Sequence, residues 1–210
     1  MKKNAILAEP EDVADRIARR TLAARGSEYS GEVRRLLDAG REVMRRNGTG
    51  ARPRVADIVA AAGLSNDAFY RHFASKDMLV AAILEDGTDR LRDYLAHQMS
   101  KEATPEGKVR RWVEGALSQA ADDDIAATTL AVLWNAGSVA DQSGPSASAP
   151  LATLLREPFA ALGSADPDLD ASRAAHAIIG KLSDHLWQRT RPSRAETEHI
   201  VAFYLAAVTR

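Results

Sequence analysis

The sequence predicts an all-α fold, with an N-terminal three-helix head and a larger C-terminal helical body. Apolar residues recur at helical spacing along most of the chain. No segment shows the alternating pattern of a half-buried strand. Breakers such as Asn-Gly, Ser-Gly-Pro and Asp-Pro stand between the periodic segments. With 210 residues, 45% of them hydrophobic and 27% charged, the chain can build a sizeable core across two parts.

Composition excludes several classes of protein. No apolar run approaches the roughly 20 residues that span a membrane. The start of the chain is too short and too soon acidic for a signal peptide. The absence of cysteine excludes disulfides and thiolate metal sites. We therefore expect a cytoplasmic protein with no membrane partner.

The N-terminal part of the chain predicts an extra helix, a break and then the first helix of the head. Residues 1–9 are predicted to form a loose tail. A helix is predicted from Pro10 to Arg25, because proline suits a first turn and acidic then basic residues complement the helix dipole. A break is predicted over Gly26–Gly31. The next helix, from Glu32 to Asn47, has an apolar side and ends at a Gly-rich stretch.

The segment from Val55 to Lys76 predicts a helix-turn-helix. Its first half is apolar at helical spacing. Gly63 then supplies the left-handed C-cap conformation, which glycine adopts without a steric cost. Ser65 is a natural N-cap for the second helix, whose apolar side includes Phe69. Two short helices joined by a Gly-bearing turn form the motif whose second helix fits the major groove of DNA.

The same stretch resembles a known family. The string G-L-S-N-D-A-F-Y-R-H-F-A-S-K-D-M-L, which begins at Gly63, resembles the diagnostic motif of the TetR/AcrR family of bacterial transcriptional regulators. The family threonine that opens the first of the two helices is absent, and Arg54 occupies its place. The match covers about residues 31–80, and beyond it length and helical layout agree. The matching residues are Gly63, Ser65, Tyr70, His72, Phe73, Lys76 and Leu79.

The resemblance implies a division of the chain and a set of DNA-binding residues. The parts are an N-terminal extension over residues 1–30, a helix-turn-helix DNA-binding domain over 31–76, and a ligand-binding and dimerisation body over 77–210. Asn66 and Asp67 are expected to face base edges, since an amide can pair with adenine and a carboxylate can accept from cytosine. For Tyr70 and His72, a role at the edge of the head's core is the alternative. The predicted DNA-binding residues are Arg54, Ser65, Asn66, Asp67, Tyr70, Arg71, His72 and Lys76.

Charge is segregated along the chain. From Arg16 to Lys76 there are 13 basic and six acidic residues, whereas from Asp77 to Arg210 there are 13 basic and 19 acidic ones. The net charge of −1 hides this difference. A basic block around a helix-turn-helix is typical of a DNA-binding head. Two alternatives stay open for the extension: its helix packs on the head with solvated arginines, or DNA is contacted by Arg16, Arg19, Arg20 and Arg25.

The rest of the chain predicts a helical body. A long helix from Lys76 or Asp77 to about Ser100 links it to the head. A loop of small residues and breakers is predicted over residues 142–150, and Asp166–Pro167 is predicted to mark another break. The other predicted helices cover residues 105–121, 125–141, 151–162, 171–189 and 193–208.

The resemblance implies a small-molecule pocket among the body helices. Aromatic and apolar linings are normal for such pockets, but the same side chains are equally normal in a plain core. The last two helices, over about residues 171–208, carry small residues and match the helices that pair two copies in the family. The candidate pocket residues are Trp112, Leu130, Trp134, Phe159, His176, Asp184 and Trp187.

These observations predict a ligand-responsive transcriptional regulator that acts as a repressor. It would bind a near-palindromic double-stranded DNA operator as a homodimer and be released by a small apolar effector. No catalytic, phosphate-binding or metal motif is present in the sequence. We therefore expect no enzymatic activity, no metal and no cofactor. The alternative is an all-helical protein-interaction module that does not bind DNA.

Overall fold

The computed structural model describes residues 13–137 and 148–208. Within these residues the chain forms α-helices and short 3-10 segments without a strand, which confirms the all-α prediction. In the same part of the chain, no helix combines the length and apolarity needed to cross a lipid bilayer. The tail predicted over residues 1–9 and most of the loop predicted over 142–150 lie outside the described residues.

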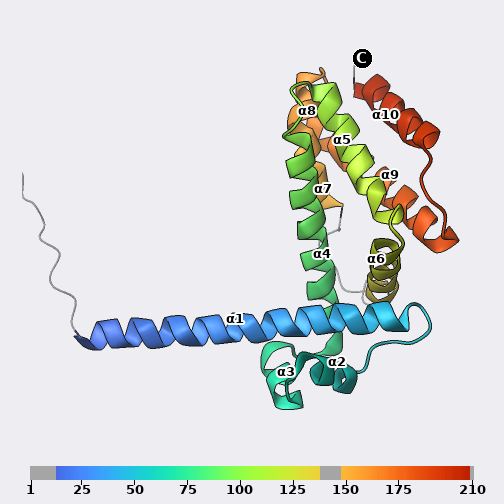
Figure 1. Ribbon diagram of the computed structural model, residues 1–210. Coiled ribbons are helices and arrows are strands. Elements are labelled where there is room, and N and C mark those ends of the chain that lie inside the picture. The colour runs from blue at the N-terminus through green and yellow to red at the C-terminus, as the bar shows by residue number, and fades with distance from the viewer. Residues whose placement is uncertain (1–12, 138–147, 209–210) are drawn as a thin grey trace, which may run out of the picture.

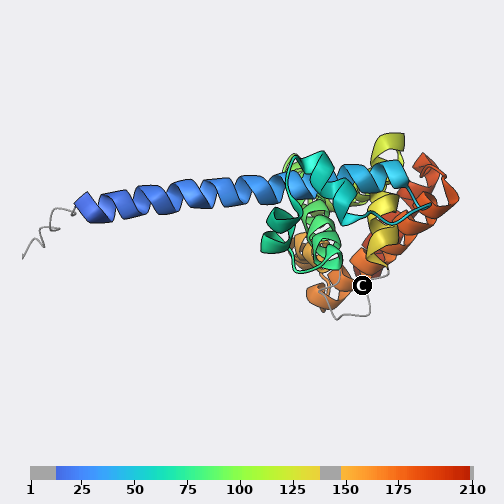
Figure 2. The same cartoon turned by 90° about the horizontal axis from the view of Figure 1, so that it is seen from below.

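Helix α1 (Val13–Asn47) is one continuous helix of 35 residues. The break predicted over Gly26–Gly31 is therefore wrong. Each glycine costs about 1 kcal/mol against alanine inside a helix. No proline interrupts the segment, however, and a nucleated helix extends cooperatively. The N-terminal half of α1 projects away from the rest of the molecule (Figure 1 and Figure 2).

The C-terminal half of α1 packs with α2 (Val55–Ala62) and α3 (Asn66–His72) to form the head. Gly63 ends α2 in the left-handed conformation, with φ of 63°. Ser65 caps α3, because its Oγ accepts a hydrogen bond of 3.1 Å from the backbone N–H of Ala68. The predicted helix-turn-helix is confirmed. Figure 2 shows the molecule from the end at which α2 and α3 lie. The buried core of the head includes Leu36, Met44, Ile58, Phe69 and Leu79.

Helix α4 (Lys76–Met99) links the head to the body, as predicted (Figure 1). Its N-cap is Ser75, whose Oγ accepts a hydrogen bond of 3.2 Å from the backbone N–H of Met78. Helices α1 and α4 approach closely at Gly40. A Cβ atom at this glycine would lie 2.7 Å from Cδ1 of Ile83. A larger residue here would push the two helices apart. This close crossing therefore sets the position of the head relative to α4.

The body follows α4 and ends with a helical pair. Its elements are α5 (Pro105–Leu117), η1 (Ser118–Ala120), α6 (Asp123–Ala136), α7 (Ala149–Ala152), η2 (Thr153–Leu155), α8 (Arg156–Ala161), α9 (Pro167–Gln188) and α10 (Arg194–Val208). The core of the body includes Leu95, Trp112, Leu155, Phe159 and Ile178. Helix α6 also contacts the head, since Ala131 and Val132 are buried in the same apolar cluster as the head residues. Head and body therefore share part of one core.

Three predicted boundaries in the body need correction. The helix predicted over 151–162 is divided among α7, η2 and α8, because Pro158 has no N–H for a continuing helical ladder and stands in the first turn of α8. Helix α9 begins at Pro167 rather than at residue 171, since the side chain of Asp166 accepts a hydrogen bond of 3.0 Å from the N–H of Leu169. Helix α6 ends at Ala136, and residues 138–141 of the predicted helix lie outside the described residues.

Candidate DNA-binding surface and ligand pockets

The side of the head that faces away from the body carries α2 and α3 (Figure 1). The start of α3 is open to solvent: Ser65, Asn66 and Asp67 are exposed, and Phe69 behind them is fully buried. Tyr70 follows with 58% of its surface exposed. Helix α3 thus presents hydroxyl, amide and carboxylate groups outward from a rigid apolar base.

His72 lies inside the head and not on its outer surface. Its side chain is fully buried, with Nε2 2.6 Å from Oε2 of Glu32 on α1. The ring of Tyr29 packs edge-on against the imidazole, with 4.3 Å between the ring centroids. The phosphate contact predicted for His72 is therefore replaced by the alternative, a role at the edge of the core.

Glu32 joins α1 to the end of α3. The same carboxylate oxygen that meets His72 also accepts a hydrogen bond of 2.8 Å from the guanidinium of Arg71. The hydrogen bond with His72, followed by that from Arg71, holds the pKa of Glu32 below its ordinary value of 4.5. No sequence pattern indicates this contact, since the partners lie about 40 positions apart. Glu32 is thus a positioning residue that sequence analysis missed.

Two further predicted contacts lie at the beginnings of helices. Arg54 stands at the N-cap of α2 without a side-chain cap bond. Its guanidinium instead makes two hydrogen bonds, of 2.8 and 3.0 Å, to the carboxylate of Asp57, and this pairing lowers the pKa of Asp57. Lys76 is the first residue of α4, next to the helix-turn-helix, and is partly exposed. Both cations therefore lie at the beginning of a helix that adjoins or belongs to the helix-turn-helix.

The residues predicted to form a ligand pocket do not come together. Trp112 and Phe159 are buried in the body core, where the indole N–H of Trp112 donates a hydrogen bond of 3.1 Å to the carbonyl of Leu151. His176, Asp184 and Trp187 are exposed on α9. In the described part of the chain, Leu130 lines a hollow at the junction of head and body, and Trp134 lies outside both pockets described below.

The larger cavity lies between α4, α6 and α9 and has a volume of about 550 Å³. Its walls are mainly apolar, with threonines on α6 and guanidinium groups from Arg41 and Arg90 near the head. This volume falls within the range of small-molecule sites. Sequence analysis missed the cavity because its lining comes from several helices whose side chains carry no shared motif. Apolar lining residues include Ile83, Leu91, Ile125, Val132, Leu133 and Ile179.

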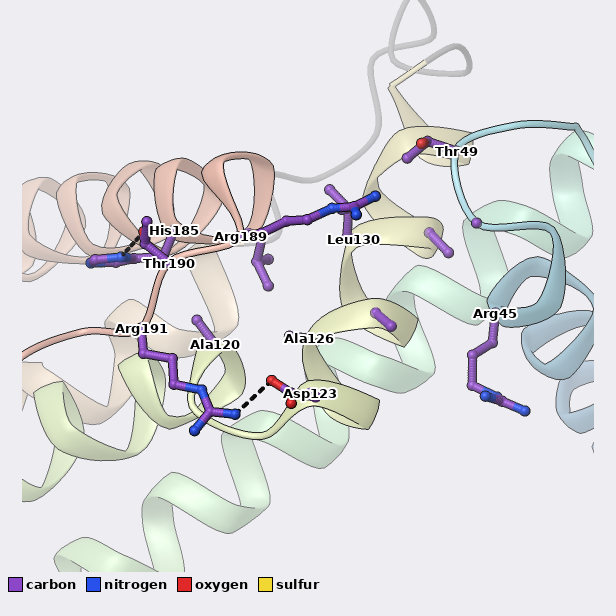
Figure 3. A pocket seen from close by; sticks show the side chains of 14 residues that line it. Arg45, Thr49, Ala120, Asp123, Ala126, Leu130, His185, Arg189, Thr190 and Arg191 are labelled. Carbon is purple, nitrogen blue, oxygen red and sulfur yellow. Dashed lines mark hydrogen bonds and ion pairs between the residues drawn. The ribbon is translucent and has the colours of Figure 1, made fainter.

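A second hollow, of about 390 Å³, lies on the other face of α6, where the end of α1 meets the end of α9 (Figure 3). The two pockets share no lining residue among those described. Arg45, Arg189 and Arg191 surround the smaller hollow.

Residues 36–83 match the family model described as bacterial regulatory proteins, tetR family. The matched segment runs from the packed half of α1 through the helix-turn-helix into α4. The head of the chain is therefore similar to the matching segment of TetR-family regulatory proteins. No curated protein matches the chain in sequence.

Solved structures extend the TetR-family likeness from the head to the whole fold. A TetR-family transcriptional regulator from Pectobacterium atrosepticum is 24% identical, with a TM-score of 0.60, and the match covers 86% of this chain and 92% of that one. The fatty acid degradation regulator FadR from Bacillus halodurans is 17% identical over 84% and 96% of the two chains, with a TM-score of 0.59. The transcriptional regulator FadR from Bacillus subtilis, in complex with stearoyl-CoA, is 16% identical over 83% and 98%, with a TM-score of 0.56. At these identities the likeness describes the fold.

Proposed function

We propose that this protein is a TetR-family regulator that represses transcription. Two copies bind a near-palindromic operator through their α3 helices, and a small effector in the body releases them. The observation that carries the proposal is the solvent-open start of α3, where Ser65, Asn66 and Asp67 stand on a buried apolar base. Such a helix can insert its N-terminal residues into a major groove.

The exposed side chains divide into base and phosphate contacts. Asn66 has the donor and acceptor that pair with adenine, and the carboxylate of Asp67 can accept only from an amino group such as that of cytosine. Tyr70, Arg71 and Lys76 supply hydroxyl, guanidinium and ammonium donors for phosphates. Ser65 contributes by capping α3, and Arg54 can exchange Asp57 for a phosphate because its side chain is 79% exposed.

The last two helices supply a surface for a second copy of the chain. Helix α9 exposes Ala177, Gly180 and Trp187 at helical spacing, and α10 exposes Ala202 and Phe203. We call these five residues the α9–α10 face. Phe203 is 64% exposed and Trp187 is 54% exposed, which is unusual for large apolar side chains. A dimer through this face would present two α3 helices to successive major grooves, whose centres lie about 34 Å apart.

The larger cavity is suited to the effector. FadR from Bacillus subtilis, which has a similar fold, holds stearoyl-CoA, and this supports a ligand role for the body. In this chain Ile83 and Leu91 of α4 line the cavity, and the same helix begins at Lys76 beside the DNA-binding surface. An effector that binds one position of α4 more tightly than another would favour the dimer conformation with that position. In this conformation the distance between the two α3 helices would no longer match the spacing of the major grooves. An apolar compound is favoured because most of the lining is apolar.

The proposed function is tested by titrating the protein with random duplex DNA at two salt concentrations and selecting bound sites from a random pool. We expect binding that weakens with salt, and a selected site with approximate two-fold symmetry. Replacement of Lys76 by alanine should lower affinity for every duplex and reduce the salt slope by about one unit. Asn66→Ala should instead relax the preference at one operator position, at a cost of about 1–3 kcal/mol.

Two outcomes would contradict this function. Equal losses on selected and random DNA for Asn66→Ala would remove Asn66 from base recognition. Failure of the wild-type protein to bind any duplex in dilute buffer would overturn DNA binding and favour the all-helical protein-interaction module.

A further inference from the structure

The smaller hollow lies at the junction of the head and the body, and both parts contribute to its lining. Arg45 and Thr49, at the end of α1 and in the following turn, form one wall. The segment that follows α9, from Arg189 to Arg191, forms the opposite wall, and one face of α6 forms the floor (Figure 3). The other face of α6 lines the larger cavity, so a single helix separates the two sites.

Positive charge dominates the rim of this hollow. Three guanidinium groups and one carboxylate, that of Asp123, are among its lining groups. Arg45 makes hydrogen bonds of 2.8 and 2.9 Å to Glu42, and Arg191 makes one of 2.8 Å to Asp123. Within residues 13–137 and 148–208, no carboxylate pairs with Arg189. Its guanidinium is therefore available to an anion from solution.

The backbone of Arg189 is held in a conformation that suits glycine. This residue ends α9 with φ of 53° and ψ of 43°, in the left-handed region. Of the described residues other than glycine, it is the one with a positive φ. Glycine would end the helix here without a steric cost. Strained conformations that persist in place of glycine are concentrated at functional sites. In Figure 3 the Arg189 side chain extends along the hollow toward α6.

The floor of the hollow is apolar and made mostly of short side chains. Alanines on α6 leave space that larger residues would fill, and Leu130 and Leu186 close the floor. A ligand that fits both features has a negative group at one end and a compact apolar body at the other. The floor residues are Ala120, Ala126, Ala127, Leu130, Ala131 and Leu186.

We propose that this hollow is a binding site for a small organic anion, with the negative group on Arg189 and the apolar body on α6. Because Arg45 and Thr49 belong to the head, an anion held there would bridge head and body. If the proposed DNA binding is correct, a bound anion favours one orientation of the head relative to the body. It therefore changes the affinity for the operator.

The site is tested without DNA, by calorimetric titration of the full chain with benzoate, phenyl phosphate and benzyl alcohol. Benzoate and phenyl phosphate carry a charged group on a compact ring and distinguish a carboxylate from a phosphate ligand, whereas benzyl alcohol is their uncharged counterpart. We expect at least one of the two anions to bind and benzyl alcohol to bind at least about tenfold more weakly. Failure of both anions to bind, or equal binding of the alcohol, would overturn the site.

Variants of Arg189 separate its charge from its place in the fold. Arg189→Asn keeps a residue that tolerates the left-handed conformation, and should lower anion affinity at least about tenfold. Arg189→Gly should do the same while raising Tm by about 2 °C, since it relieves the backbone. The matched control is Arg194→Gln, which removes an exposed arginine at the start of α10 and should bind as wild type. Unchanged binding by Arg189→Asn would overturn the role of the guanidinium.

Operator affinity is then measured with and without the anion that binds. A change of about fivefold or more is expected for wild type and should be lost in Arg189→Asn. An unchanged operator affinity under saturating anion would overturn the link between the sites. If no duplex binds at all, the proposed DNA binding fails, and the calorimetric result still decides the anion site.

Discussion

Glu32 restrains two side chains at the end of α3, those of Arg71 and His72. One carboxylate oxygen meets both Nε2 of His72 and the guanidinium of Arg71. Because these contacts lower the pKa of Glu32, its ionised form stabilises the folded state. That contribution is present above the ordinary pKa of 4.5 and is lost as the pH falls through the lower folded-state value. Arg71 is at the same time held by a carboxylate that competes with phosphate.

We predict that Glu32→Gln destabilises the protein at pH 7 and strengthens its binding to random DNA. The free energy of unfolding, measured in urea, should differ most from wild type at neutral pH, and the difference should shrink below about pH 4. The salt slope of random DNA binding should steepen by about one unit, because Arg71 becomes free to contact a phosphate. Glu85→Gln is the control, since it removes an exposed carboxylate from α4. Equal effects of the two variants would contradict the role of Glu32.

Sequence patterns are sufficient at residues whose structure is set by near neighbours. Gly63 and Ser65 end and begin helices as predicted, because each acts within a few positions of itself. For His72, the buried side chain favours the core-edge alternative over the predicted DNA contact, since its environment is set by Glu32 and Tyr29 on another helix. The outward face of a helix is therefore predictable only as far as the packing partners of that helix are known.

At the scale of elements, the projecting half of α1 differs most from expectation. Breakers at Gly26 and Gly31 predict two helices, but helix propagation carries α1 through both. The half of α1 that projects into solvent excludes the alternative in which this segment packs on the head (Figure 2). Contact between the arginines of this segment and DNA phosphates stays a prediction.

We predict that deletion of residues 1–25 weakens binding to operators with long flanks. The salt slope should become shallower by about one unit for each phosphate that the shortened protein no longer neutralises. The head should stay folded, because the buried core residues described on α1 are Leu36, Ala39, Val43 and Met44, all after the deleted segment. A duplex trimmed to the symmetric core is the control and should bind the two proteins equally. Identical affinity and salt dependence on the long duplex would end the idea that this segment contacts DNA.

The cavities could not be predicted from the helices taken one at a time. Most body helices are predicted by their own periodicity, yet three of the aromatic residues predicted to form a pocket, Trp112, Phe159 and Trp187, lie in the core or on the surface. Trp112 packs inside and Trp187 faces solvent, although both lie on helices of the predicted kind. Cavities arise from the gaps between helices, and these depend on crossing angles and on small residues such as Gly87 of the larger cavity.

At the scale of the whole molecule, the proposed repression requires two heads at a fixed spacing. Helices α9 and α10 each pack one side against the body and leave the α9–α10 face open. A Cβ atom added at Gly180 would meet no heavy atom within 4 Å, so this face is not filled within one copy. Small residues let two helices approach closely, and Trp187 and Phe203 add apolar area.

We predict that Gly180→Arg converts the protein to a folded monomer that loses operator binding. Arginine is a better helix former than glycine by about 0.8 kcal/mol, and the position is open, so the single copy should be at least as stable as wild type. Two copies, however, could no longer approach through α9. Without the dimer each head binds one half-site independently, and operator affinity should fall by about a hundredfold or more. Sedimentation velocity and DNA titration measure the two effects. Gly180→Ala adds helix propensity with little bulk and should remain a dimer, whereas a dimeric Gly180→Arg protein would show that the two copies meet elsewhere.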